Sequence, residues 1–221
     1  WRSILLASLL FYGSLLGMGL LVYLFPELIY SLLSPQQVAK MELMYDPDSS
    51  RLGPWAGRGS GDDWLMFGYY IMNNIGIAFQ TFASGLLLGI GSLFFLLYNG
   101  LNIGAIAGHL IRIGYDETFL GFVVGHGAFE LTAITFAGAA GLQLGGALLM
   151  PGPRSRRAAL RSAARGCVGL LAGVIGLLLI AAFVEAYWSS VTRFPVTVKY
   201  TVGIALWLLV GAYFGLGGRR R

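Results

Sequence analysis

The sequence predicts an all-α fold: a polytopic transmembrane helix bundle with about six membrane segments, one of them short or re-entrant. Hydrophobic residues make up 57% of the 221 residues and charged residues only 11%, whereas soluble domains carry about 25% charged residues. Several apolar runs approach or exceed the roughly 18 residues that mark a membrane-spanning helix. The 33 glycines lie largely inside these runs, where small residues let membrane helices pack closely. We therefore expect a single membrane domain over residues 1–221.

The first predicted span covers residues 4–25 and ends before Pro26 and Glu27. The longest polar stretch follows, over residues 34–63, and its prolines, glycines and excess of acidic side chains are typical of a loop. We expect this loop to be extracytoplasmic and to contain one short helix over about residues 36–44.

The next apolar run, residues 64–98, is too long for one span, which needs about 20 residues. We expect a broken or interfacial part over 64–72 and a span over 75–97, with Asn73 and Asn74 at the junction. Residues 100–113 are short for a full crossing, so this segment is predicted to be a tilted crossing or a re-entrant helix. The last three predicted spans cover residues 119–149, 168–188 and 200–216.

Arginines set the expected topology, because Lys and Arg concentrate in cytoplasmic connections. The connector over residues 151–167 carries five of them, and the tail after residue 216 carries three more. With both on the cytoplasmic side, six crossings place both termini inside; a re-entrant 100–113 would leave five and move the N-terminus outside. The connector arginines are expected to contact anionic lipid, or alternatively a cytoplasmic partner: Arg154, Arg156, Arg157, Arg161 and Arg165.

Ionisable residues inside predicted spans are few, and they are costly there unless other protein groups compensate them. His126 and Glu130 are four residues apart, so a helix points both the same way. Glu185 lies near the outer end of a later span. We predict an intramembrane polar network with these members: Asn73, Asn74, Asn99, Asn102, His126, Glu130 and Glu185.

Four interpretations of this set compete. The favoured one is structural: the side chains bond one another and fix helix register. A proton or ion path comes next, then a metal site that uses His126, Glu130 and a third ligand, and last an intramembrane protease. The sequence lacks the His-Glu-x-x-His pattern, a nucleophile elbow and a phosphate loop, so we expect no catalytic residue, no metal and no cofactor. Basic residues confined largely to segment ends and one connector also argue against nucleic acid as a partner.

Small residues recur four apart, as in Gly100/Gly104/Gly108 and Gly169/Gly173. Residues four apart share a helix face, so these positions predict close contacts between helices. Packing within the bundle is the favoured use, and a homo-oligomer interface is the alternative.

Several motifs, in their order and spacing, resemble the stage II sporulation protein M family of integral membrane proteins. They are Asn73-Asn74-Ile75, the Gly85–Gly91 run, Tyr98-Asn99-Gly100-Leu101, His126-Gly127-x-x-Glu130-Leu131 with Ala137–Gly141, and Ile180–Ala186. The resemblance is best over residues 64–188. The first segment and the acidic loop resemble the non-sporulating, proteobacterial branch, whose members usually carry an N-terminal cytoplasmic region, so we expect the chain to be part of a longer protein.

The resemblance implies a bacterial inner-membrane protein that acts as a scaffold and recruits envelope or cell-wall remodelling partners. Its expected partners are membrane lipids and other membrane or envelope proteins, with a homo-oligomer as an alternative arrangement. The runner-up is a channel, transporter or lipid-handling protein whose polar path is lined by Asn73, Asn74, His126, Glu130 and Glu185. An enzyme is the third reading.

Overall fold

The computed structural model describes residues 2–54 and 60–217, and over these ranges the chain is helical with no β-strand. Five helices in these ranges are long and apolar enough to cross a membrane. The prediction of an all-α, multi-pass bundle is therefore confirmed. These helices are α1 (Arg2–Leu24), α4 (Ile90–Arg112), α5 (Asp116–Leu149), α6 (Arg156–Val184, continued by the π-helical turn η4, Glu185–Ser189) and α7 (Val196–Leu216).

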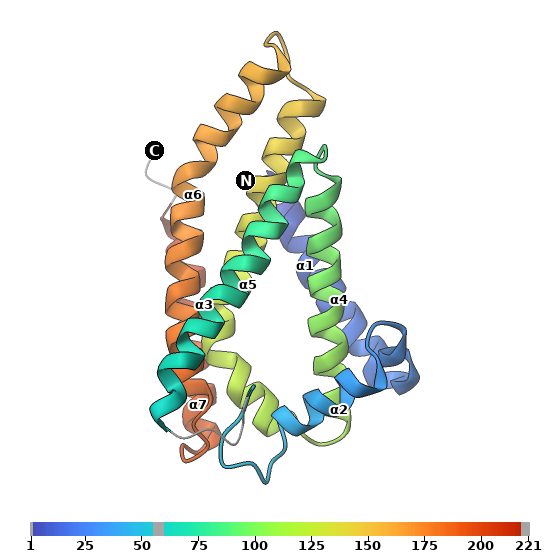
Figure 1. The fold of residues 1–221 in the computed structure, drawn as a ribbon, viewed down its shortest axis with the longest axis vertical. Coiled ribbons are helices and arrows are strands. Elements are labelled where there is room, and N and C mark those ends of the chain that lie inside the picture. The colour runs from blue at the N-terminus through green and yellow to red at the C-terminus, as the bar shows by residue number, and fades with distance from the viewer. Residues whose placement is uncertain (1, 55–59, 218–221) are drawn as a thin grey trace.

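A further long helix, α3 (Asp63–Ala83), lies in the bundle against α5 and α6 (Figure 1). Its 21 residues correspond to about 32 Å, close to the roughly 30 Å of a bilayer's hydrocarbon core. α3 carries Asn73, Asn74 and Gln80, and it is not among the five helices that are apolar enough to be counted as candidate spans. Asn74 is buried in the bundle, whereas Asn73 and Gln80 are exposed.

The predicted division of residues 64–113 is wrong. α3 runs unbroken through Asn73 and Asn74, and the chain reverses instead at the 3-10 turn η3 (Ser84–Leu86). Gly89 follows with φ +85°, a left-handed conformation that favours glycine. The helix that begins at Ile90 continues to Arg112, so residues 100–113 are the second half of a full-length helix rather than a short segment.

Glycines on one face of α4 let it lie directly against α1. A Cβ atom added to Gly104 would lie 2.2 Å from the Leu15 carbonyl oxygen, and one added to Gly108 would lie 2.2 Å from the Gly19 carbonyl oxygen. Atoms this close overlap, so the observed approach requires glycine. Gly169 and Gly173 of α6, by contrast, have nothing within 4 Å of such a Cβ, and the structure assigns them no packing role.

The basic connector is largely helical. The 29-residue helix α6 begins at Arg156, after Ser155 caps its first turn through the Ala158 amide. Four of the five connector arginines therefore lie on the first turns of α6, and Arg154 precedes them, with Nη1 donating to Ser162 Oγ at 3.1 Å. All five are exposed. The α5–α6 hairpin extends beyond the α3–α4 turn at that end of the molecule (Figure 1).

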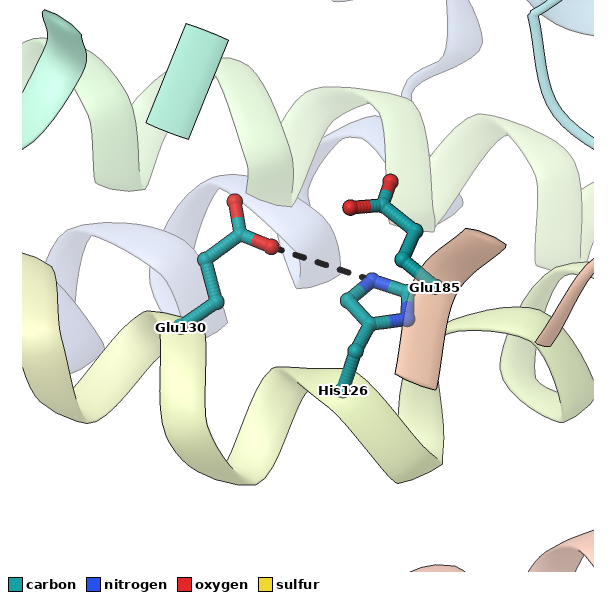
Figure 2. A group of neighbouring side chains, drawn as sticks. All are labelled: His126, Glu130 and Glu185. Carbon is teal, nitrogen blue, oxygen red and sulfur yellow. Dashed lines mark ion pairs between the residues drawn. The ribbon is translucent and has the colours of Figure 1, made fainter. Parts of the chain in front are cut away.

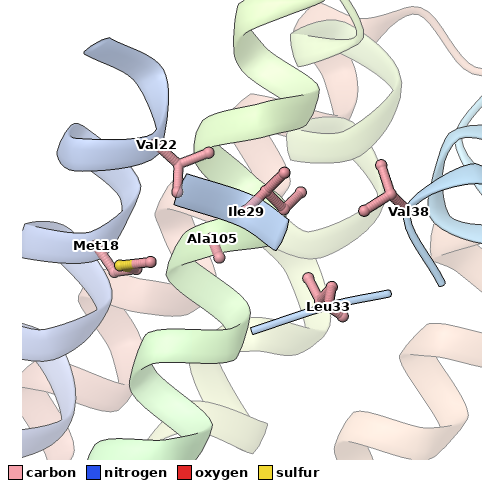
Figure 3. Packing of buried hydrophobic residues seen from close by; sticks show 6 residues of the cluster. All are labelled: Met18, Val22, Ile29, Leu33, Val38 and Ala105. Atoms are coloured by element: carbon pink, nitrogen blue, oxygen red, sulfur yellow. The ribbon is translucent and has the colours of Figure 1, made fainter. Parts of the chain in front are cut away.

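The polar loop lies at the opposite end of the bundle (Figure 1). Its short helix α2 (Pro35–Met44) confirms the expected helix near 36–44 and begins with a capping box between Ser34 and Gln37. It follows the 3-10 helix η1 (Pro26–Ser31), and η2 (Ser60–Asp62) leads into α3. One apolar cluster holds α2 and η1 against α1 and α4 (Figure 3): Met18, Val22, Ile29, Leu33, Val38 and Ala105.

Candidate functional site

Three ionisable side chains from two helices meet inside the bundle (Figure 2). His126 and Glu130 project from one face of α5, as their spacing predicts, and the histidine Nε2 lies 3.9 Å from a Glu130 carboxylate oxygen. Glu185 comes from the end of α6. One ligand atom from each of the three residues can be chosen so that all lie within 4.8 Å of one another, which makes them the candidate metal ligands of the described residues.

The π-helical turn η4 helps to place Glu185. A π-turn inserts one extra residue per turn and often occurs at functional sites. It carries Glu185 at its start and Ser189 at its end, both buried. The Ser189 hydroxyl lies 3.0 Å from His126 Nδ1, within hydrogen-bond distance. The same short turn therefore supplies one carboxylate of the site and a hydrogen-bonding partner for its imidazole.

Two more polar side chains support the site from neighbouring helices. Asn74 of α3 donates from Nδ2 to Glu185 Oε2 at 3.4 Å. Lys199 of α7 is buried, and its Nζ donates to the Ser189 carbonyl at 2.9 Å. Four helices thus contribute to one polar centre: α3, α5, α6 and α7.

When both are ionised, the carboxylates of Glu130 and Glu185 repel each other. Two like charges about 5 Å apart repel by roughly 3 kcal/mol at an effective dielectric constant of 20, and by more in drier surroundings. A bound cation or proton that lies between Glu130 and Glu185 would relieve this repulsion. The site is therefore suited to attract positive charge.

A cavity of about 240 Å³ reaches these groups. Its polar floor contains Asn73, Asn74, His126, Glu130 and Glu185, all predicted members of the polar network. Apolar side chains of α4 and α5 form the walls, among them Ile103, Ile106 and Phe122. Residues of the polar loop border it as well: Met41, Met44, Tyr45 and Pro54.

Tyr45 connects the loop to the site. Its ring packs edge-on against Phe119 and Phe122 of α5. Burial, and then the charges of Glu185 and Glu130, raise the pKa of the Tyr45 hydroxyl above its ordinary value. The phenol therefore stays neutral at physiological pH.

Two predicted network members do not reach the site. Asn99 donates to the Phe95 carbonyl at 2.7 Å and Asn102 to the Tyr98 carbonyl at 2.8 Å, each four residues back in α4. Asn73 joins the group by donating to Asn74 Oδ1 at 3.0 Å. Ser189, Lys199 and Tyr45 are site neighbours that the sequence reasoning missed. The only signal for Lys199 was a lysine in the first turn of an apolar helix.

A family model described as stage II sporulation protein M matches residues 4–190. The chain belongs to this family. The part matched to stage II sporulation protein M runs from α1 to one residue past η4 and includes His126, Glu130, Glu185 and Ser189, whereas Lys199 lies beyond it. No curated protein and no solved structure matches the chain.

Proposed function

We propose that this protein binds a small polar or charged ligand in an intramembrane pocket, as a channel, transporter or lipid-handling protein does. The cavity that joins the loop end to His126, Glu130 and Glu185 carries this proposal. A purely structural network has no need of such a space, because its side chains are satisfied by one another. The apolar walls and the few converging polar groups are typical of ligand sites.

The depth of the site fits this role. His126 is ten residues from the start of α5, which corresponds to about 15 Å along the helix axis. The floor of the pocket thus lies well inside the bundle on the side of the polar loop. Charged groups at such depth are costly and commonly mark ion or substrate pathways.

Cysteine accessibility tests whether the pocket is open to water. In a Cys167→Ser background, Val123→Cys and Leu131→Cys place thiols on the pocket lining. We expect a charged, membrane-impermeant thiol reagent to label both from the loop side. Ala133→Cys, buried on the same helix in a different cluster, is the matched control and stays unlabelled. Equal labelling at all three positions, or none, would contradict an open pocket.

Flux measurements then test transport. In proteoliposomes of purified protein, we expect uptake of a permeant cation that Glu130→Gln and Glu185→Gln each reduce at least about tenfold, since both carboxylates line the path. Uptake equal to that of empty liposomes would refute transport and leave only the proposal that the pocket binds a ligand.

A scaffold that recruits envelope or cell-wall remodelling partners is the second proposal. Family membership favours it, and so does the projecting α5–α6 hairpin with its exposed arginines. Its partners would be anionic lipids and other membrane or envelope proteins, with the chain in the bacterial inner membrane, alone or as a homo-oligomer. In both proposals the protein is not an enzyme. Replacement of the five connector arginines by glutamine should weaken binding to anionic liposomes and leave the pocket's labelling unchanged.

A further inference from the structure

The three ionisable groups at the pocket floor supply the kinds of ligand atom that bind metal ions. His126 supplies an imidazole, and Glu130 and Glu185 supply carboxylates from two different helices (Figure 2). Ligands bound to Zn²⁺ at 2.0–2.1 Å with tetrahedral angles lie about 3.3 Å apart. The ligand atoms here lie within 4.8 Å of one another, so small rotations of the glutamate side chains bring all three to one ion.

We propose that His126 Nε2, Glu130 and Glu185 bind one divalent transition-metal ion, for which Zn²⁺ is the probe. This proposal rests on the proposed function, because the ion must enter through the pocket. One imidazole with two carboxylates suits zinc, whereas a site of oxygen ligands alone would suit magnesium or calcium. A divalent ion also balances the charge of two carboxylates.

The Ser189 hydroxyl is placed to accept a hydrogen bond from His126 Nδ1, which is the arrangement that metal binding through Nε2 requires. A histidine that binds metal through one ring nitrogen usually donates from the other to a neighbouring oxygen. The Ser189 hydroxyl lies 3.0 Å from Nδ1, so a proton on Nδ1 leaves the Nε2 lone pair for the ion. Nε2 is the nitrogen that faces Glu130. Lys199 Nζ donates to the backbone carbonyl of the same serine and so helps to hold this turn in place.

Three protein ligands leave a tetrahedral ion with one open position. Zinc sites that bind substrate keep such a position, whereas structural zinc sites fill all four with protein ligands. His126, Glu130 and Glu185 all line the cavity, so the open position would face it. An oxygen donor such as water, a carboxylate or a phosphate would take that position.

Zinc titration of the purified chain tests the proposal. The protein is prepared in lipid nanodiscs without a polyhistidine tag, and Zn²⁺ is titrated in competition with a chromophoric chelator at pH 7.5. We expect one Zn²⁺ per chain, lost in Glu130→Gln and Glu185→Gln. Ser189→Ala should keep the stoichiometry and weaken affinity about 10-fold, the effect typical of an outer partner. Affinity should fall at lower pH, because protons compete for the same ligands.

Glu42→Gln is the matched control, because Glu42 also faces a histidine, His109, at 2.8 Å, but outside the pocket floor. It should bind Zn²⁺ as the unmodified chain does, and thermal unfolding of every variant in the apo state checks that it folds. No stoichiometric binding, or equal binding by the Glu130→Gln/Glu185→Gln double variant, would overturn the site. Loss of Zn²⁺ binding in Glu42→Gln would show that the ion does not bind at His126, Glu130 and Glu185. An accessible pocket without zinc binding would refute this inference and leave the proposed function standing.

Discussion

The residues of the polar centre show what a sequence can and cannot predict. His126 and Glu130 were predictable as a pair because helical geometry alone puts residues four apart on one face. Glu185 was predictable as a member of the polar network because an ionisable residue in a membrane span needs partners. Ser189 and Lys199 were not, because their roles depend on the π-turn and on where α7 lies against it. Such contacts are set by tertiary packing.

A second polar contact, between Glu42 and His109, holds the loop helix α2 to α4. Glu42 Oε1 lies 2.8 Å from His109 Nε2, and the histidine is buried while the glutamate is partly exposed. We predict that Glu42→Ala loosens α2 by about 0.5–1 kcal/mol, the usual contribution of a partly exposed polar pair. Hydrogen exchange of the α2 amides should become about two- to fivefold faster.

The control for this prediction is Glu27→Ala, an exposed carboxylate in the neighbouring turn η1. In Glu27→Ala, the hydrogen exchange of the α2 amides should match that of the unmodified chain. If Glu42→Ala also leaves the exchange of α2 unchanged, the apolar cluster around Val38 alone is sufficient to hold the helix.

At the scale of elements, the helix pattern was predictable and one turn was not. Residues 85–89 are glycine and leucine, so composition did not distinguish them from a span. The asparagines at 73 and 74 looked like a junction, yet they lie in mid-helix and line the pocket. Polar residues in a membrane helix thus indicate either an end or a site, and the sequence alone does not say which.

The contact between α1 and α4 offers a sharp test of glycine packing. We predict that Gly104→Ala lowers stability by about 1–3 kcal/mol, the cost typical of overpacking, because its Cβ would overlap the Leu15 carbonyl. Thermal unfolding in detergent measures this effect. Gly17→Ala on α1 is the control, since nothing lies within 4 Å of its added Cβ, and helix propensity alone should make it neutral or slightly stabilising. Equal melting temperatures for the two variants would refute the close contact.

For the whole molecule, the ends of the bundle differ in charge and in shape. The basic α5–α6 hairpin projects at one end, and the polar loop lies at the other (Figure 1). Residues of this loop border the pocket. Ile4 and Phe214 share a cluster with Leu170, so the first turn of α1 and the last turns of α7 lie toward the hairpin end. The expectation that both termini lie on the cytoplasmic side, with the connector arginines, stays a prediction.

The arginines at the hairpin end predict on which side of the membrane that end lies. We predict that a reporter inserted after Pro153 is cytoplasmic and one inserted after Asp48 is on the outer face, because Lys and Arg are retained inside. Alkaline phosphatase, which is active only outside the cytoplasm, should be active at Asp48 and inactive at Pro153; a fluorescent protein that folds only inside should give the reverse. The pocket, bordered by the loop, would then open outward. Phosphatase activity at Pro153 would show that the orientation is the reverse and that the pocket opens toward the cytoplasm. This measurement therefore decides from which side a ligand enters.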